Sequence, residues 1–416
     1  MSSEKSGALM SEQEYRQRIL DLCDQPLRKV RSVLADNYGQ PLAETYVSKV
    51  DLPSFRNSAM DGYAVRAEDT RNVPVTLQVT GDVPAGSPGD VALTPGTAMR
   101  IMTGAPIPPG ADAVVRVEWT NRGTDQVTIT KSVTVGAEIR EAGEDLRKGD
   151  SVGVDGDVTS PGRIGLLAAS GHDQVFMWGP AHVGVVATGD ELYPVGIELP
   201  PGGIYDSNSH QGRELVKRAG GVVSERITLT DDIDEAVAQL RELAQRSDLI
   251  VTSGGVSAGS YEVVKDVFNK LGGGIFTGVD IQPGKPQGYG VIDETPVVCL
   301  PGNPVSAFVS FELFVRPLIR KMGGHKHYQS PEAPAKITAD LKRAPHRTRY
   351  LPATLDWNTM TVETPHVHGS HRVSVAAAAN CLIRIPGMHL DAPGSDLGDV
   401  LSAGSTVRVV LLDPLT

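Results

Sequence analysis

Four short segments of this 416-residue chain combine glycine with polar side chains directly after apolar runs. The richest spans residues 252–260 and reads Thr-Ser-Gly-Gly-Val-Ser-Ala-Gly-Ser. Glycines let a backbone turn its N–H groups toward an anion, serine hydroxyls add donors, and a following helix adds partial positive charge. The segment matches neither the P-loop nor G-x-G-x-x-G. It predicts a phosphate-binding loop, with an ordinary strand-to-helix turn as the alternative; its candidate residues are Ser253, Gly254, Gly255 and Ser257.

Two other segments carry carboxylates. Asp190 and Glu191 follow the apolar run 182–188, where they suit a divalent cation or acid–base chemistry, unless they are solvated loop acids. Asp206, Ser207 and Asn208 precede a helical stretch, and capping that helix is the favoured role for at least one of them.

The fourth segment, residues 300–307, contains prolines that restrict the backbone of a turn and a glycine that gives the backbone more conformational freedom. Its candidate residues are Pro301, Gly302, Asn303 and Ser306. Just upstream, Lys285 lies in a stiff Pro-Gly-Lys-Pro turn, which suits an anion better than a structural role. The spacing of His366, His368 and His371 permits a metal site, but an exposed polar loop is the favoured interpretation.

Composition narrows the class of protein. The net charge of −11 argues against a broad nucleic-acid surface, because phosphate backbones need clustered Lys and Arg. The three cysteines, Cys23, Cys299 and Cys381, are far apart, which argues against a disulfide framework and fits a reducing cytoplasm. The chain has no signal-peptide-like start and no apolar run of about 18 residues, so no membrane span is expected.

The apolar pattern divides the chain into regions. Residues 11–23 predict a short amphipathic helix, and short apolar runs between 47 and 157 predict a small β domain. From 182 to 322, strands predicted at 182–188, 222–229, 248–252 and 297–300 alternate with helices predicted at 209–219, 233–246, 261–271 and 305–322. This alternation predicts a parallel sheet with helices on both faces, and residues 335–412 predict a second β module. In such sheets ligands bind beyond the carboxyl ends of the strands, where the polar segments lie.

Nine motifs occur in one order over residues 50–385: NSAMDGYA, RIMTGAP, EDL, TGDEL, IYDSN, SGGVSAG, PGKP, PGNPVSA and GSH…ANCLI. This set resembles the molybdopterin molybdenumtransferase family, which includes bacterial MoeA and the gephyrin E domain. The resemblance implies a multidomain α/β plus β fold, with a doubly wound, mostly parallel α/β molybdopterin-binding domain (181–328). It also implies an elongated discontinuous domain (11–55 and 141–180), an inserted β domain (56–140) and a C-terminal β-barrel (329–416).

The resemblance further implies an Mg²⁺-dependent transferase that inserts molybdate into adenylylated molybdopterin and releases AMP. It implies a homodimer with a shared active site, in which Asp61 and Thr103 face the partner's α/β domain. Glu191, Asp231 and Glu262 would bind Mg²⁺ or handle the pyrophosphate link. The 252–260 loop, Lys285, Asn303 and Ser306 would line the cleft, and Arg347 and Ser370 would bring the C-terminal domain to molybdate. The alternative is a carrier or scaffold of the same fold without full activity.

The chain departs from the family pattern at four positions. Glu262 stands where Asp is common, which leaves a carboxylate one methylene longer. Gly278 and Gln282 stand where relatives often have lysine, and Pro352 stands at a position of arginine. These changes remove up to three cations, for which Arg349 and Arg372 are candidate replacements.

Overall fold

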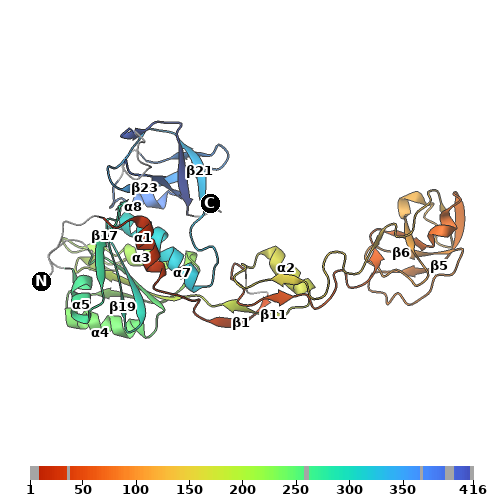
Figure 1. The fold of residues 1–416 in the computed structure, drawn as a ribbon, viewed down its shortest axis with the longest axis horizontal. Coiled ribbons are helices and arrows are strands. Elements are labelled where there is room, and N and C mark those ends of the chain that lie inside the picture. The colour runs from red at the N-terminus through yellow and green to blue at the C-terminus, as the bar shows by residue number, and fades with distance from the viewer. Residues whose placement is uncertain (1–8, 35–37, 257–261, 366–368, 389–397, 413–416) are drawn as a thin grey trace. The chain divides into compact units, whose positions relative to one another are not determined.

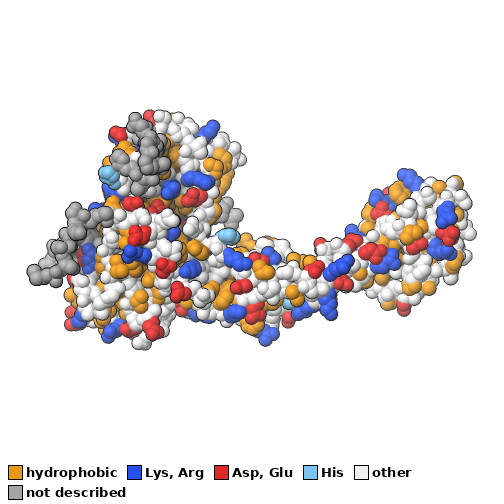
Figure 2. Space-filling view, viewed as in Figure 1, with side chains coloured by type: hydrophobic (Ala, Val, Ile, Leu, Met, Phe, Trp, Pro, Cys, Tyr) orange, Lys and Arg blue, Asp and Glu red, His pale blue; other side chains and the backbone are white. Residues whose placement is uncertain are grey.

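A computed structural model describes residues 9–34, 38–256, 262–365, 369–388 and 398–412. The chain divides into two compact units, one formed by Met1–Val30 with Trp178–Thr416 and the other by Arg31–Met177. The unit boundary between Val30 and Arg31 falls within the predicted elongated-domain segment 11–55, and the four-domain division itself remains a prediction. On the face shown in Figure 2, acidic and basic side chains are interspersed.

The first unit is built on a six-stranded sheet with strand order β15-β12-β16-β20-β19-β17 (Figure 1). The first four strands are parallel, whereas β19 is antiparallel to β20 and β17 is antiparallel to β19. The predicted mostly parallel sheet is thus confirmed, and its two antiparallel strands were not visible in the sequence pattern. The strands are β12 (His182–Thr188), β15 (Val222–Leu229), β16 (Leu249–Ser253), β17 (Ile275–Gly278), β19 (Pro286–Ile292) and β20 (Thr295–Leu300).

Helices cover both faces of this sheet, as predicted. Val185 and Val251 pack toward one face with Leu215 of α3 and Val309 of α6. On the opposite face, a second cluster joins the sheet to α4 and α5. The helical segments are α3 (Asn208–Arg218), α4 (Ile233–Ala244), α5 (Val263–Leu271), α6 (Pro304–Ser310), the π-helix η4 (Phe311–Val315) and α7 (Arg316–Met322).

The continuous helical segment from α6 to α7 contains a buried charged cluster. Glu312 is fully buried and pairs with Arg218, and Arg316 lies 3.9 Å from its second carboxylate oxygen. Burial raises the pKa of Glu312, while both arginines oppose that rise. His325, which follows the helix, accepts a 3.2 Å hydrogen bond at Nδ1 from Arg320.

The N-terminal helix α1 (Glu12–Leu20) packs against this unit. Ser11 caps it by accepting a 3.1 Å hydrogen bond from the N–H of Glu14. Tyr15 donates to the carbonyl of Gly288 at 3.0 Å, and the ring of Phe314 meets its ring edge to face. The helix predicted over 11–23 therefore forms, and its apolar side is buried on the α/β core.

The C-terminal part forms the predicted β-barrel. Strands β23, β24, β21, β27 and β25 pair in that order, and β25 pairs back with β23 to close the barrel. One strand of the α/β region, β18 (Ile281–Gln282), adds to this sheet through parallel pairing with β23. The elements are β21 (Glu332–Ile337), β22 (Leu341–Lys342), β23 (Thr348–Asp356), β24 (Thr361–Glu363), α8 (Val373–Ala377), β25 (Cys381–Ile385), β26 (Val400–Leu401) and β27 (Thr406–Leu411).

The second unit contains a five-stranded sheet, order β7-β4-β6-β5-β8, which confirms the predicted small β region. Its remaining part has short strand pairs and one helix, α2 (Pro161–Ala169), capped by Ser160. Strands of the sheet are β4 (Gly62–Val65), β5 (Val75–Val83), β6 (Thr97–Ile101), β7 (Ala113–Arg116) and β8 (Gln126–Ile129). The short strands are β1 (Lys29–Val33), β2 (Tyr46–Val47), β3 (Asn57–Ser58), β9 (Ile139–Arg140), β10 (Ser151–Gly153) and β11 (Gln174–Trp178).

Among the described residues, no helix is both long and apolar enough to cross a membrane. The three cysteines are free thiols.

Candidate functional site

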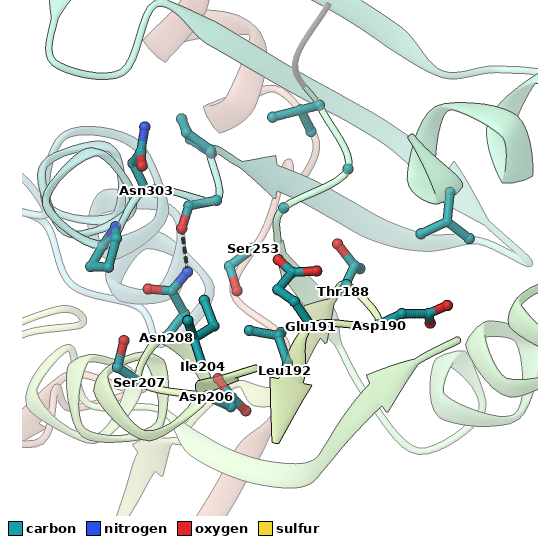
Figure 3. Close-up of a pocket in the computed structure, with 18 of the residues that line it drawn as sticks. Thr188, Asp190, Glu191, Leu192, Ile204, Asp206, Ser207, Asn208, Ser253 and Asn303 are labelled. Carbon is teal, nitrogen blue, oxygen red and sulfur yellow. Dashed lines mark hydrogen bonds between the residues drawn. The ribbon is translucent and has the colours of Figure 1, made fainter. Parts of the chain in front are cut away.

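The loops after the parallel strands meet around one cavity of about 730 Å³ (Figure 3). Parallel strands end at the same edge of a sheet, so the loops after β12, β15, β16 and β20 converge there. The cavity, here called the acidic pocket, falls within the range of about 300–1,000 Å³ typical of small-molecule sites. Its lining includes Asp190, Glu191, Asp206, Asn208, Asp231, Ser253, Gly254, Gly255, Glu262, Pro301, Gly302, Asn303 and His371.

The two glycines after β16 take backbone conformations that side chains disfavour. Gly254 has φ +99° and Gly255 has φ +69°. A Cβ at Gly254 would lie 2.5 Å from the hydroxyl of Thr188, and one at Gly255 would lie 2.8 Å from Val264. Glycine is therefore required here for the conformation and for close packing. Ser257 of the predicted phosphate-binding loop lies outside the described residues.

The loop after β20 packs against the glycines of the β16 loop. A Cβ at Gly302 would stand 3.4 Å from the Cα of Gly254. Asn208, from the start of α3, donates a 2.7 Å hydrogen bond to the carbonyl of Gly302 (Figure 3). This bond ties α3 to the β20 loop and fixes the width of the pocket between them.

The polar residues before α3 divide into two roles. Asp206 accepts hydrogen bonds from the N–H of Ser209, at 2.9 Å, and from its hydroxyl, so it caps the helix as the sequence suggested. Ser207 makes no side-chain cap bond. Asp206 also lines the pocket, so capping does not remove it from the site.

Carboxylates from two neighbouring strands lie close together. Asp190 and Glu191 follow β12, and the carboxylate of Glu191 folds back over Gly189, whose Cβ would lie 2.5 Å from it. Asp231 follows β15, the strand beside β12. Burial raises the pKa of Asp231, as do the charges of Asp190 and Glu191 and a hydrogen bond with Asp190. The next residue, Asp232, caps α4 through the N–H groups of Asp234 and Glu235, which leaves Asp231 to the pocket.

These acids suit part of a magnesium site. Among the described residues, no group of three His, Cys, Asp or Glu side chains is placed to hold a metal ion. Mg²⁺, however, usually binds through one or two carboxylates together with substrate phosphates. The repulsion that raises the pKa of Asp231 is what a bound cation would relieve. The donor set therefore fits a cation that a phosphate-bearing ligand completes.

Several predicted residues are not among the described residues that line this pocket. Ser306 is buried in α6. Ser370 accepts a 2.9 Å hydrogen bond at its backbone carbonyl from the N–H of Val305, which brings its loop to the start of α6. Arg347 directly precedes β23, and neither it nor Ser306 is among the described lining residues. Lys285 lies in an adjoining cavity instead.

The two candidate replacement arginines do not line the acidic pocket either. Arg349 donates to the carbonyl of Lys342, and burial lowers its pKa. Arg372 precedes α8. Of the histidine group, His371 lines the pocket, whereas His366 and His368 lie outside the described residues.

Asp61 and Thr103 form a pair in the second unit. Asp61 accepts hydrogen bonds from the N–H of Thr103 at 2.7 Å and from its hydroxyl at 2.8 Å. The two bonds lower the pKa of the Asp61 carboxyl. The pair is exposed, and apart from the family resemblance nothing in the sequence marks either residue as part of a site. Forty-two positions separate them, so no local pattern revealed the pairing.

Fold and site together define a class: a multidomain α/β protein with a pocket of small-molecule size lined by glycine-rich loops, and with a β-barrel joined edge to edge to its α/β region. Residues 10–171 match the family described as MoeA N-terminal region (domain I and II). Residues 184–321 match a probable molybdopterin binding domain, and residues 334–412 match the MoeA C-terminal region (domain IV).

Relatives that match over nearly the whole chain point to the same family. Molybdopterin molybdenumtransferase 2 of Mycobacterium tuberculosis is 43% identical over 388 residues, covering 91% of this chain and 96% of that protein. Molybdopterin molybdenumtransferase of Haemophilus influenzae is 35% identical, covering 95% and 97%. The molybdopterin biosynthesis moeA protein of Pyrococcus horikoshii, whose crystal structure is known, superposes with a TM-score of 0.83 at 28% identity, covering 97% and 100%. This chain belongs to the MoeA family of molybdopterin molybdenumtransferases, which confirms the resemblance of its nine motifs.

Proposed function

We propose that this chain is a molybdopterin molybdenumtransferase, which inserts molybdate into adenylylated molybdopterin with release of AMP during molybdenum cofactor biosynthesis. The observation that carries the proposal is the acidic pocket, where glycine-rich backbone and a carboxylate cluster meet at the carboxyl ends of parallel strands. Family membership over nearly the whole chain supports the same activity.

The pocket's own residues suit the two parts of such a substrate. The absence of side chains at Gly254 and Gly255, both at positive φ, would let the backbone approach a phosphate closely. Asn208 bonds to Gly302, which packs against Gly254, and this adjoining wall would position the pterin side. One or two of the carboxylates of Glu191, Asp231 and Glu262, together with the phosphates of the substrate, would hold Mg²⁺, which would supply positive charge at the pyrophosphate link. Without a cation, these carboxylates repel that link, so turnover should require one.

The shared active site is part of the proposal. Asp61 is held ionised and oriented by Thr103 on an exposed surface. An oriented exposed carboxylate suits a role against a second protomer, so the active form should be a homodimer. We expect it to act in the cytoplasm, where its cysteines remain thiols.

The decisive experiment mixes the purified protein with adenylylated molybdopterin, Mg²⁺ and molybdate and measures AMP. The parent should release AMP only when Mg²⁺ and molybdate are both present. Asp231→Asn should lower the rate and weaken the dependence on Mg²⁺, whereas Asp234→Asn, on the exposed side of α4, should not. Tight binding of molybdopterin with no AMP release would instead identify a carrier. Glu262→Asp and Gln282→Lys, assayed beside the parent, measure the effect of the family departures.

A further inference from the structure

One residue of the C-terminal region reaches the acidic pocket. Every other described lining residue lies in the range 188–304 of the α/β region, whereas His371 comes from the loop that precedes α8. His371 belongs to the group of three histidines noted in the sequence, to which the proposed function gives no role. The described lining holds no lysine, arginine or other histidine, so His371 is its only basic side chain.

A tight turn places His371 at the pocket. The N–H of Arg372 donates to the carbonyl of Gly369 at 3.2 Å, which closes the turn in which His371 is the third residue. The N–H of Val305, in the first turn of α6, donates to the carbonyl of Ser370 at 2.9 Å. The turn that carries His371 is therefore bonded directly to the α/β region.

The packing of α8 holds the same loop. Ala376 of α8 is buried in the hydrophobic cluster that also contains Val305 and Phe308 of α6. Because burial of apolar surface is favourable, this contact fixes the helix that follows the turn. The loop is thus docked on the α/β core both by a hydrogen bond and by apolar packing.

Gly369 leaves room for the imidazole ring of His371. A Cβ at Gly369 would lie 3.0 Å from Cε1 of His371 and 3.3 Å from its Nδ1. These distances are tighter than ordinary van der Waals contact, so a side chain at Gly369 would push the ring away. The ring is exposed and makes no hydrogen bond within the part of the chain that the structure describes. Its nitrogens are therefore available to a ligand.

The strand order decides which part of a ligand His371 meets. Along the carboxyl edge of the sheet the strands run β15, β12, β16 and β20. Asp231 follows β15, Asp190 and Glu191 follow β12, and Asn303 follows β20. Figure 3 shows Asn303 and Asp190 on different sides of the pocket. Neighbouring strands lie about 4.8 Å apart, so the β15 and β20 ends are separated by roughly 14 Å. His371, tied to the start of α6, lies at the β20 end.

The two ends of the pocket suit different parts of a ligand. The carboxylates of the β12 and β15 loops suit a cation and the phosphates that it bridges. The β20 end instead offers amide and imidazole groups, from Asn208, Asn303 and His371. An imidazole ring always carries at least one N–H donor, which suits a heterocycle with carbonyl and ring-nitrogen acceptors. Since no group of three His, Cys, Asp or Glu among the described residues is placed to hold a metal ion, this role fits His371 better than metal binding.

We infer that His371 is a substrate-contacting specificity residue, which donates a hydrogen bond to the heterocycle of the pterin half of the ligand. The identity of that ligand rests on the proposed function. A bicyclic pterin presents a carbonyl oxygen and ring nitrogens at its edge, and these atoms accept hydrogen bonds. The C-terminal region then takes part in recognising the substrate, and Gly369 is a positioning residue for the ring.

The test separates the two halves of the substrate by anaerobic calorimetric titration of the full chain. His371→Ala should weaken the binding of molybdopterin about fivefold, the loss expected for one hydrogen bond, and should leave the binding of AMP unchanged. His371→Gln keeps an N–H donor and should retain most of the affinity. The matched control is His327→Ala, which replaces an exposed histidine outside the described pocket lining and should bind both ligands as the parent does.

Gly369→Ala tests the position of the ring. It should weaken the binding of molybdopterin, whereas Gly398→Ala, where the added Cβ meets no atom within 4 Å, should not. Because Gly369 acts through the ring, combining Gly369→Ala with His371→Ala should cost no more affinity than His371→Ala alone. Additive losses would show that Gly369 acts by another route and would remove it as a positioning residue.

Unchanged binding of molybdopterin by His371→Ala overturns the inference. An equal loss of AMP affinity also overturns it, since that result would indicate a general disturbance of the pocket. In turnover, His371→Ala should raise the KM for adenylylated molybdopterin and leave kcat nearly unchanged. If the parent binds molybdopterin through His371 but releases no AMP, the proposed transferase alone is refuted. If it releases AMP and His371→Ala leaves the KM unchanged, the inference alone is refuted.

Discussion

The carboxylate of Asp61 is held by Thr103 through two hydrogen bonds to the same oxygen, one from the backbone N–H and one from the hydroxyl. Because both donors stabilise the ionised form, the pKa of Asp61 falls below its ordinary value. The arrangement leaves the second oxygen of Asp61 without a bond to Thr103 and fixes its direction. The second oxygen of this exposed, oriented carboxylate can accept a hydrogen bond from another molecule.

Replacing Thr103 by valine should raise the pKa of Asp61, because the hydroxyl donor is lost while the backbone donor remains. The lowered pKa in the parent means that the interaction stabilises the fold above the ordinary carboxyl pKa and is lost as the pH falls through the folded value. Thr103→Val should therefore lose part of that pH dependence. NMR titration of the Asp61 carboxyl measures it directly.

The matched control is Thr76→Val, which removes an exposed hydroxyl that meets Thr128 instead of a carboxylate. It should leave the Asp61 titration unchanged. If Thr103→Val also leaves it unchanged, the side-chain bond contributes nothing and only the backbone N–H orients the acid. In the proposed dimer, Thr103→Val should lower AMP release and Thr76→Val should not.

Gly254→Ala should damage the site more than an equally strained substitution elsewhere. A side chain at φ +99° costs about 1–2 kcal/mol in backbone strain, and its Cβ would also press on Thr188. Gly196→Ala is the control, since Gly196 has φ +92° with no atom within 4 Å of the added Cβ. Urea unfolding should show a larger loss for Gly254→Ala by at least about 1 kcal/mol. Equal losses would contradict the close packing between the β12 and β16 loops.

His325 should make the α/β unit sensitive to acid. Burial and the charges of Arg320 and Arg316 lower the pKa of His325 to about 3. The unfolded chain takes up the proton near the ordinary pKa of about 6.5, so stability is lost as the pH falls from about 6.5 toward 3. By pH 5 this costs roughly 1–2 kcal/mol, which His325→Gln should not lose.

The measurement is urea unfolding of parent and His325→Gln at pH 7 and pH 5. The parent should lose more stability than the variant over this interval. Between pH 7 and pH 8 the ring stays neutral in folded and unfolded chains, so the difference between the two proteins should be constant. Parallel loss at pH 5 would show that the folded protein accepts the proton at His325 after all.

The sequence predicted the strands and helices that bury clear apolar faces. The strands at 182–188 and 222–229 form at the predicted bounds, and α4 begins where Asp232 caps it. The antiparallel strands β17 and β19 were missed because glycines interrupt their apolar pattern and weaken any strand preference. The pairing of β18 with β23 was missed because nothing local encodes a partner 67 positions away.

The loops of the site were predictable for a related reason. Glycine and serine after a buried strand are a local pattern, and Gly254, Gly255 and Asn303 were found from it. The closeness of Asp231 to Asp190 depends on β15 lying beside β12, an order that alternation alone does not give. The place of His371 in the same pocket likewise depends on the contact between its loop and the start of α6, which lie far apart in the sequence.

The pairing of β18 with β23 affects how this protein can be dissected. Along the chain, the match to the molybdopterin binding domain ends at residue 321 and the match to the C-terminal region begins at residue 334, but Ile281 and Gln282 lie in the barrel's sheet. Excising the barrel would expose the polar backbone of those two residues, immediately before the turn that carries Lys285. An α/β fragment without the barrel would therefore lose the strand pairing that holds the backbone just before Lys285. Fusions or domain exchanges across this boundary should transfer residues 281–286 together with the barrel.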